Sequence, residues 1–186
     1  GGFDREGALT FLKGVAGDNI ELVEQPLTAA DLEGSRKCRE IGIPISLDES
    51  LITLQDAISI VRNDACDIMN IKIPRVGGFL LAKKMAAVAD ASGLPVICGG
   101  RTALEISRAA SRHFAAATMG ATGIAHEGPG PASQELSDDV VAKRTRRDET
   151  GAAGGFVKVE SGPGLGIEIN WEKVDKYAVS GFSISS

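Results

Sequence analysis

The strongest constraint on the fold is a regular alternation of short apolar runs with longer amphipathic segments. The segments between the runs carry apolar residues at three-to-four spacing, which is typical of helices. The runs themselves are apolar on both faces, which is typical of strands covered by helices in parallel βα units. Strands are therefore expected at 19–24, 43–48, 66–73, 94–98 and, more weakly, 120–125. This pattern predicts an α/β fold, either an open doubly wound sheet or a (β/α) barrel.

Helix signals lie between these runs, at 5–15, 28–42, 53–64, 78–93 and 103–117. Thr28 with Asp31, and Thr53 with Asp56, have the spacing of capping boxes at helix starts. No glycine-rich phosphate-binding motif follows the first strand, so the nucleotide-binding versions of the open sheet lose support. Near the C-terminus, 155–161 and 165–170 predict one β-hairpin.

Composition and charge exclude several classes of partner. The chain of 186 residues is 43% hydrophobic and 24% charged, which is typical of a folded globular protein. Its net charge of -5 argues against binding to nucleic acid or to an anionic membrane. The three cysteines form no CxxC motif, so we expect reduced, packed thiols and a cytoplasmic location.

Three strands end in charged residues at equal intervals. Glu24, Asp48 and Lys72 are each separated by 24 residues. Because the carboxyl ends of parallel barrel strands meet at one face, these side chains are expected to lie together. Two carboxylates suit a hard cation such as Mg²⁺, and a lysine beside them can move protons. A salt-bridge cluster at solvated strand ends explains the same spacing equally well.

The motifs "VEQP", "LDES" and "NIKIPRVGG" resemble the barrel of the enolase superfamily, in particular its muconate lactonizing enzyme subgroup. The resemblance implies that Glu24 and Asp48 bind Mg²⁺, or Mn²⁺ in its place, and that Lys72 is one of two lysines flanking the substrate. A lysine at this strand, where the mandelate racemase subgroup has an acid, favours the muconate branch. The Lys-or-His base with Mg²⁺ and an ene-diolate is the general description of such sites.

The reaction implied by this resemblance is removal of a proton α to a carboxylate in a small substrate, through an enediolate. Epimerisation or cycloisomerisation is the first expectation, and dehydration of the o-succinylbenzoate synthase or sugar-acid type is the alternative. The Asp-x-Asp of the family's dipeptide epimerases is absent, which argues against that activity. A non-catalytic barrel fragment is the alternative from another class, and the intact set of three residues argues against it.

The family's third metal ligand, an Asp, and its KxK lysines would precede Gly1. We therefore expect residues 1–186 to form the C-terminal part of a barrel, from the helix after the third strand to the C-terminal tail. The N-terminal capping domain and the first strands would lie outside this chain. The whole protein is expected to be a homo-oligomer.

Four further residues are candidates for contact with substrate. Arg101 can fork onto a carboxylate, and Glu105 matches an acid that the family often places after this glycine-rich turn. His126 and Glu127 match positions that set substrate choice in the family. Glu105 can equally be an ordinary acid in the first turn of a helix, and a histidine in a loop is often incidental. The basic stretch 142–147 is interpreted as a solvated face or a subunit contact.

Overall fold

The computed structural model describes residues 1–100, 103–121, 126, 137–145 and 157–181. The chain divides into two compact units, which are treated separately below. The first unit comprises residues 1–99 and 114–127, and the second comprises residues 100–113 and 128–186.

The first unit is built on a parallel sheet of four strands, in the order β1-β2-β3-β4. The strands are β1 (Val23–Glu24), β2 (Ile45–Leu47), β3 (Ile68–Ile71) and β4 (Val96–Cys98). Each strand pairs with the next along the chain, without the reversal of order that marks an open doubly wound sheet. This unbroken order is that of a barrel wall, so the structure decides between the two predicted architectures.

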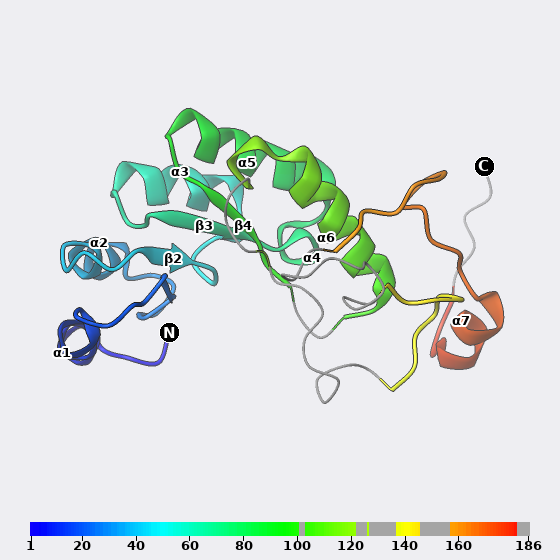
Figure 1. Cartoon of the computed structure of the whole chain (residues 1–186), viewed down its shortest axis with the longest axis horizontal. Coiled ribbons are helices and arrows are strands. Elements are labelled where there is room, and N and C mark those ends of the chain that lie inside the picture. Colours follow the sequence, from blue (N-terminus) through cyan, green and yellow to red (C-terminus); the bar gives the residue numbers. More distant parts are fainter. Residues whose placement is uncertain (101–102, 122–125, 127–136, 146–156, 182–186) are drawn as a thin grey trace. The chain divides into compact units, whose positions relative to one another are not determined.

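Helices follow the strands in the expected alternation. The helix α3 (Leu54–Arg62) packs against α5 (Phe79–Ala91), and α5 also contacts β3 (Figure 1). The full set of helices is α1 (Arg5–Val15), α2 (Leu32–Arg39), α3 (Leu54–Arg62), α4 (Ile73–Val76), α5 (Phe79–Ala91), α6 (Glu105–Ala117), the 3₁₀ turn η1 (Met119–Ala121) and α7 (Trp171–Tyr177). Within the described residues, no helix has the length and apolar character needed to cross a bilayer.

Of the two capping boxes predicted from the sequence, one is found in the structure and one is not. The Thr53–Asp56 capping box at the start of α3 is present in full. The prediction for Thr28 is wrong, because α2 begins at Leu32 and its N-cap is Asp31, whose carboxylate accepts from the Gly34 N–H at 2.9 Å. The backbone N–H of Asp31 instead closes a turn onto the Thr28 carbonyl, which keeps Thr28 outside the helix.

The core lies between the sheet and its helices. Every residue of β2, β3 and β4 is buried, which explains the continuous apolar runs in the sequence. Large side chains such as Leu47, Met69 and Met85 are wholly buried. Burying one such side chain contributes about 1.5–3 kcal/mol, so this sheet anchors the first unit and fixes the residues at its edges.

The second unit differs from the sequence prediction in its backbone pairing. Ile169 forms an antiparallel bridge with Val141, supported by the bond from the Asn170 N–H to the Val140 carbonyl at 2.8 Å. Residues 157–161 carry no strand, so the predicted hairpin with 165–170 is wrong within the described part of the chain. The weak strand prediction at 120–125 begins in the turn η1, and residues 122–125 lie outside the described residues.

Candidate functional site

The parallel register brings the three charged strand-end residues to one edge of the sheet. Glu24 ends β1 and pairs with Ser46, and Asp48 directly follows β2. Lys72 directly follows β3 and is the N-cap residue of the short helix α4. The predicted grouping of Asp48 with Lys72 is a direct contact, because the Lys72 Nζ donates to Asp48 Oδ2 at 2.9 Å.

Asp48 is the buried centre of this edge, with an exposed fraction of 1%. Besides Lys72, it accepts from Arg75, whose Nη1 lies 2.6 Å from Oδ1 and whose Nη2 lies 3.1 Å from Oδ2. The sequence interpretation missed Arg75. The available signal was its spacing, since three residues after the N-cap Lys72 is about one helical turn. Two cations thus compensate the charge of this one buried carboxylate.

Gln25 fixes the loop after β2 against the end of β1. Its side-chain oxygen accepts from the backbone N–H of Asp48 at 3.0 Å and of Ser50 at 3.2 Å. Its amide nitrogen donates to the Leu27 carbonyl and to the Ser50 hydroxyl, both at 2.9 Å. The residue is buried and has a φ of 41°, a strained value for a side chain other than glycine. Gln25 therefore does more than turn the chain: it sets the position of Asp48 relative to Glu24.

The donor chemistry of this edge fits a hard divalent cation. Glu24 and Asp48 supply carboxylate oxygens from neighbouring strand ends, and Mg²⁺ is commonly bound by one or two carboxylates together with waters and substrate. Among the residues that the structure describes, no group of three or more His, Cys, Asp and Glu side chains is arranged to hold a metal. A cation at this edge would therefore need oxygens beyond those of the two carboxylates.

Glu105 lies in a different environment, in the second unit. It is wholly buried at the start of α6, where its backbone N–H donates to Asp139 Oδ2 at 3.0 Å. Its Oε1 accepts from Arg112 Nη2 at 2.5 Å, and the same nitrogen donates to Glu160 at 2.6 Å. Thr145 also donates to Glu160. Glu105 belongs to an ion-pair network in this structure, and its predicted contact with substrate stays a prediction.

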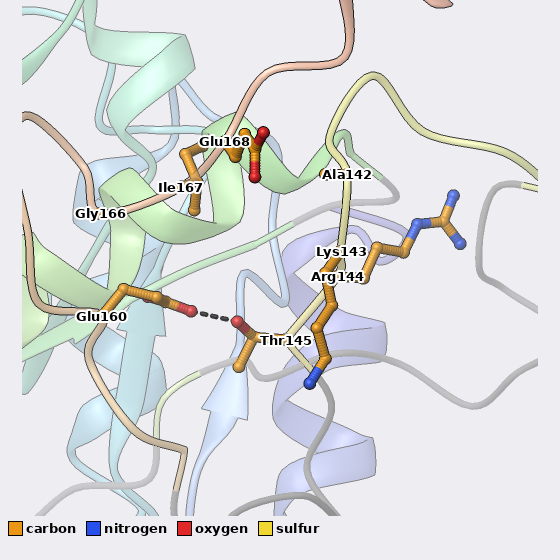
Figure 2. Close-up of a pocket in the computed structure, with 8 residues that line it drawn as sticks. All are labelled: Ala142, Lys143, Arg144, Thr145, Glu160, Gly166, Ile167 and Glu168. Atoms are coloured by element: carbon orange, nitrogen blue, oxygen red, sulfur yellow. Dashed lines mark hydrogen bonds between the residues drawn. The ribbon is translucent and has the colours of Figure 1, made fainter.

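A shallow cavity of about 280 Å³ lies beside this network in the second unit. Figure 2 shows Thr145 and Glu160 pointing toward each other across it. Its lining combines Lys143 and Arg144 with Glu160 and Glu168. Because its lining carries two basic and two acidic side chains, it favours no ligand of a particular charge.

The remaining substrate-contact candidates are only partly described. The His126 Nδ1 accepts from the backbone N–H of Cys98 at 3.2 Å, which places this residue beside the end of β4. Burial holds the pKa of His126 below its ordinary value and so favours the neutral imidazole. Arg101 and Glu127 lie outside the described residues. Their proposed roles stay predictions.

Comparison with known proteins places the chain in a family. Residues 1–174 match the enolase C-terminal domain-like family. The chain belongs to this family. It is 34% identical over 176 residues to muconate cycloisomerase 1 of Rhodococcus opacus, covering 92% of this chain and 44% of that protein. It is 37% identical over 153 residues to the L-Ala-D/L-Glu epimerase of Clostridium acetobutylicum, covering 82% of this chain and 40% of that protein.

A third relative carries out a different reaction type. The o-succinylbenzoate synthase of Bacillus subtilis is 33% identical over 173 residues, covering 91% of this chain and 44% of that protein. The chain thus spans less than half the length of each of these three relatives. Together they show a family of isomerases and a lyase.

Solved structures agree on the fold. The 2-chloromuconate cycloisomerase of Rhodococcus opacus 1CP superposes with a TM-score of 0.83 at 29% identity, covering 96% of this chain and 46% of that one. A dipeptide epimerase of Enterococcus faecalis, solved with Mg and a dipeptide, gives 0.77 at 27% identity, covering 89% and 45%. The parallel sheet of the first unit is therefore part of a (β/α) barrel of the enolase-superfamily type.

Proposed function

We propose that the whole protein removes a proton α to a carboxylate in a small substrate, with Mg²⁺, and returns it in an epimerisation or cycloisomerisation. The observation that carries this proposal is the joint position of Glu24, Asp48 and Lys72 at the ends of three successive parallel strands. Membership of the enolase C-terminal domain-like family supports it.

Lys72 is the proposed acid–base group. As a neutral amine it would take the α-proton, and as an ammonium it would give a proton back, which is the ordinary action of a general base and acid. Its ammonium donates a hydrogen bond to Asp48 in the structure, where Arg75 offers a second positive charge to the same carboxylate. Arg75 thus still compensates the negative charge of Asp48 when the Lys72 ammonium turns toward the substrate.

Glu24 and Asp48 are the proposed ligands of Mg²⁺, with the dipeptide epimerase structure that contains Mg as support from the family. When bound, the cation supplies positive charge beside the substrate carboxylate, which stabilises the enediolate. The role of the chain itself is to orient the two ligands. Gln25 does this through the backbone N–H of Asp48.

Dehydration is the second candidate, and one observation favours it: the 33% identity to an o-succinylbenzoate synthase is close to the 34% identity to a muconate cycloisomerase. Both reactions begin with the same proton abstraction. They differ in whether the enediolate regains a proton or loses a leaving group.

The test is deuterium exchange at the α-carbon of N-succinylamino acids and of Ala-Glu dipeptides, followed by NMR in D₂O. The proposal predicts exchange that requires Mg²⁺ and stops in EDTA. Inversion at the α-carbon of these substrates would identify an epimerase. A dehydratase would instead be identified by loss of water, in the mass spectrum, from a carboxylate substrate that carries a β-hydroxyl group. Exchange that is equally fast in EDTA would contradict the proposal.

A further inference from the structure

Asn70 is a buried amide that the proposed reaction has not used. It lies in β3, two residues before Lys72, and its exposed fraction is 0%. Its Nδ2 donates to Glu24 Oε2 at 3.1 Å, across 46 residues of sequence. An ionised carboxylate only accepts hydrogen bonds, so the amide must present its N–H group to Glu24 and direct its oxygen elsewhere.

The oxygen of this amide is buried and has no hydrogen-bond partner among the residues that the structure describes. Buried polar atoms are nearly always paired, because leaving one unpaired costs free energy. Such an atom beside the charged side chains of Glu24 and Lys72 indicates a partner that arrives in another state of the site. Asn70 Oδ1 is therefore a candidate acceptor for a neighbouring donor.

Gly99 shows which donor lies close. A Cβ atom at Gly99 would stand 2.1 Å from Asn70 Oδ1 and 2.6 Å from Lys72 Cε. The Asn70 oxygen and the end of the Lys72 side chain thus share the space that the missing side chain leaves open. The Lys72 ammonium now donates to Asp48, and Asn70 Oδ1 is a second acceptor within reach of a change of rotamer.

We propose that Asn70 is a positioning residue that links the two halves of the site. Its N–H group orients the Glu24 carboxylate for a divalent cation, and its oxygen receives the Lys72 ammonium when Asp48 is engaged by that cation. Gly99 is required because any side chain there would displace both partners. This inference rests on the proposed function, and it assigns roles to two residues, Asn70 and Gly99, to which the sequence analysis gave none.

The experiment measures Mg²⁺ affinity by calorimetry on the substrate-free whole protein, beside α-proton exchange. Asn70→Leu keeps the size of the side chain and removes both hydrogen-bonding groups. Asn70→Ser removes the amide without adding apolar bulk, in case the leucine variant does not fold. Gly99→Ala displaces Lys72 and the Asn70 oxygen without removing the Asn70 amide. Gly14→Ala is the matched control, because a Cβ there meets nothing within 4 Å.

Both Asn70 variants are expected to weaken Mg²⁺ binding by about 10-fold or more, the usual effect of removing a partner that orients a metal ligand. Gly99→Ala is expected to lose most of its exchange activity, because its Cβ would stand 2.1 Å from Asn70 Oδ1 and 2.6 Å from Lys72 Cε and so displace both side chains. A purely structural role for Asn70 would lower the melting temperature and leave the Mg²⁺ dissociation constant of the folded protein unchanged.

Three results would overturn this inference, and they are distinguishable. If the parent binds Mg²⁺ and both Asn70 variants bind it equally well, Asn70 does not position Glu24, while the proposed function stands. If Gly99→Ala exchanges α-protons as fast as the parent, the reaction does not need Asn70 Oδ1 to accept from Lys72 in the space beside Gly99. A parent that binds no Mg²⁺ would contradict the proposed function and this inference together.

Discussion

Two buried carboxylates, Asp48 in the first unit and Glu105 in the second, are held by arginines in nearly the same way. Arg75 lies 2.6 Å from Asp48, and Arg112 lies 2.5 Å from Glu105. Their exposed fractions are 1% and 0%. By burial and charge pairing alone, the two sites are alike.

They differ in what surrounds the ion pair. Asp48 follows a parallel strand, next to the ammonium of Lys72 and on the edge that also carries the exposed Glu24. Glu105 starts a helix, and its arginine is shared with Glu160 from the C-terminal segment. The first arrangement leaves groups that can bind a cation and move a proton, whereas the second ties a helix to a tail. A buried ion pair is thus evidence for chemistry only when its neighbours supply the other parts.

The largest expected effect is on turnover, from Lys72→Ala. Loss of a general acid–base group reduces turnover by about 10²–10⁴-fold. Mg²⁺ affinity should survive, because Lys72 lies beside the two carboxylate ligands. The measurement is α-proton exchange together with Mg²⁺ calorimetry, with the exposed Lys84→Ala as the matched control. Near-normal turnover would remove Lys72 from the mechanism.

In the second unit the expected effect is on stability, from Arg112→Met. Removing one partner of a buried ion pair costs about 3–5 kcal/mol, because it leaves uncompensated charge on Glu105 and Glu160. Urea unfolding measures the loss. Arg36→Met is the control, since the exposed Arg36–Glu40 pair should contribute only about 0.3–0.5 kcal/mol. Equal losses in the two variants would show that the second network is not a structural anchor.

At alkaline pH, the free energy of unfolding should depend on a thiol in the apolar interior of the first unit. Burial raises the pKa of the Cys66 thiol from 9.0 to about 12, so the folded state keeps the proton that the unfolded state loses. This contribution to stability is complete below pH 9 and is lost as the pH rises toward 12, with about 1.4 kcal/mol lost by pH 10. Cys66→Ala should flatten this part of the curve of unfolding free energy against pH. An unchanged curve would show that Cys66 does not control it.

The smallest expected effect compares two threonines that the sequence treats alike. Thr53→Ala removes a true N-cap and should cost about 1 kcal/mol of unfolding free energy. Thr28→Ala should change it by less than about 0.5 kcal/mol, because Thr28 is exposed and lies outside α2. Thermal unfolding of the two variants checks this difference, and a larger cost at Thr28 would contradict the observed cap.

The sequence predicted those features that depend on local periodicity. The helix at 5–15 is found with its predicted bounds, and the strands lie inside the predicted runs. The joint position of Asp48 and Lys72 followed from strand ends in register. All three cysteines are buried, as the prediction of packed thiols indicated.

The features that were missed depend on contacts between residues distant in sequence. The sequence predicts only that Gln25 and Pro26 turn the chain, whereas in the fold the Gln25 side chain accepts hydrogen bonds from the loop after β2. Asn70 reads as one polar residue in a strand, although it reaches Glu24. The bridge between Val141 and Ile169 replaced a predicted local hairpin because no periodic signal marks a partner that far along the chain.

The central claim is that Glu24 and Asp48, and not Glu105, hold a divalent cation. The most direct test is calorimetric titration of Mg²⁺ into the whole protein and into Glu24→Gln, Asp48→Asn and Glu105→Gln. We expect Glu24→Gln and Asp48→Asn to bind Mg²⁺ at least roughly 10–100-fold more weakly than the parent, since mutating residues that only hydrogen-bond to metal ligands already costs that much affinity. Glu105→Gln is expected to bind Mg²⁺ as tightly as the parent. Unchanged binding in Glu24→Gln and Asp48→Asn would contradict the account, as would an equal loss in Glu105→Gln.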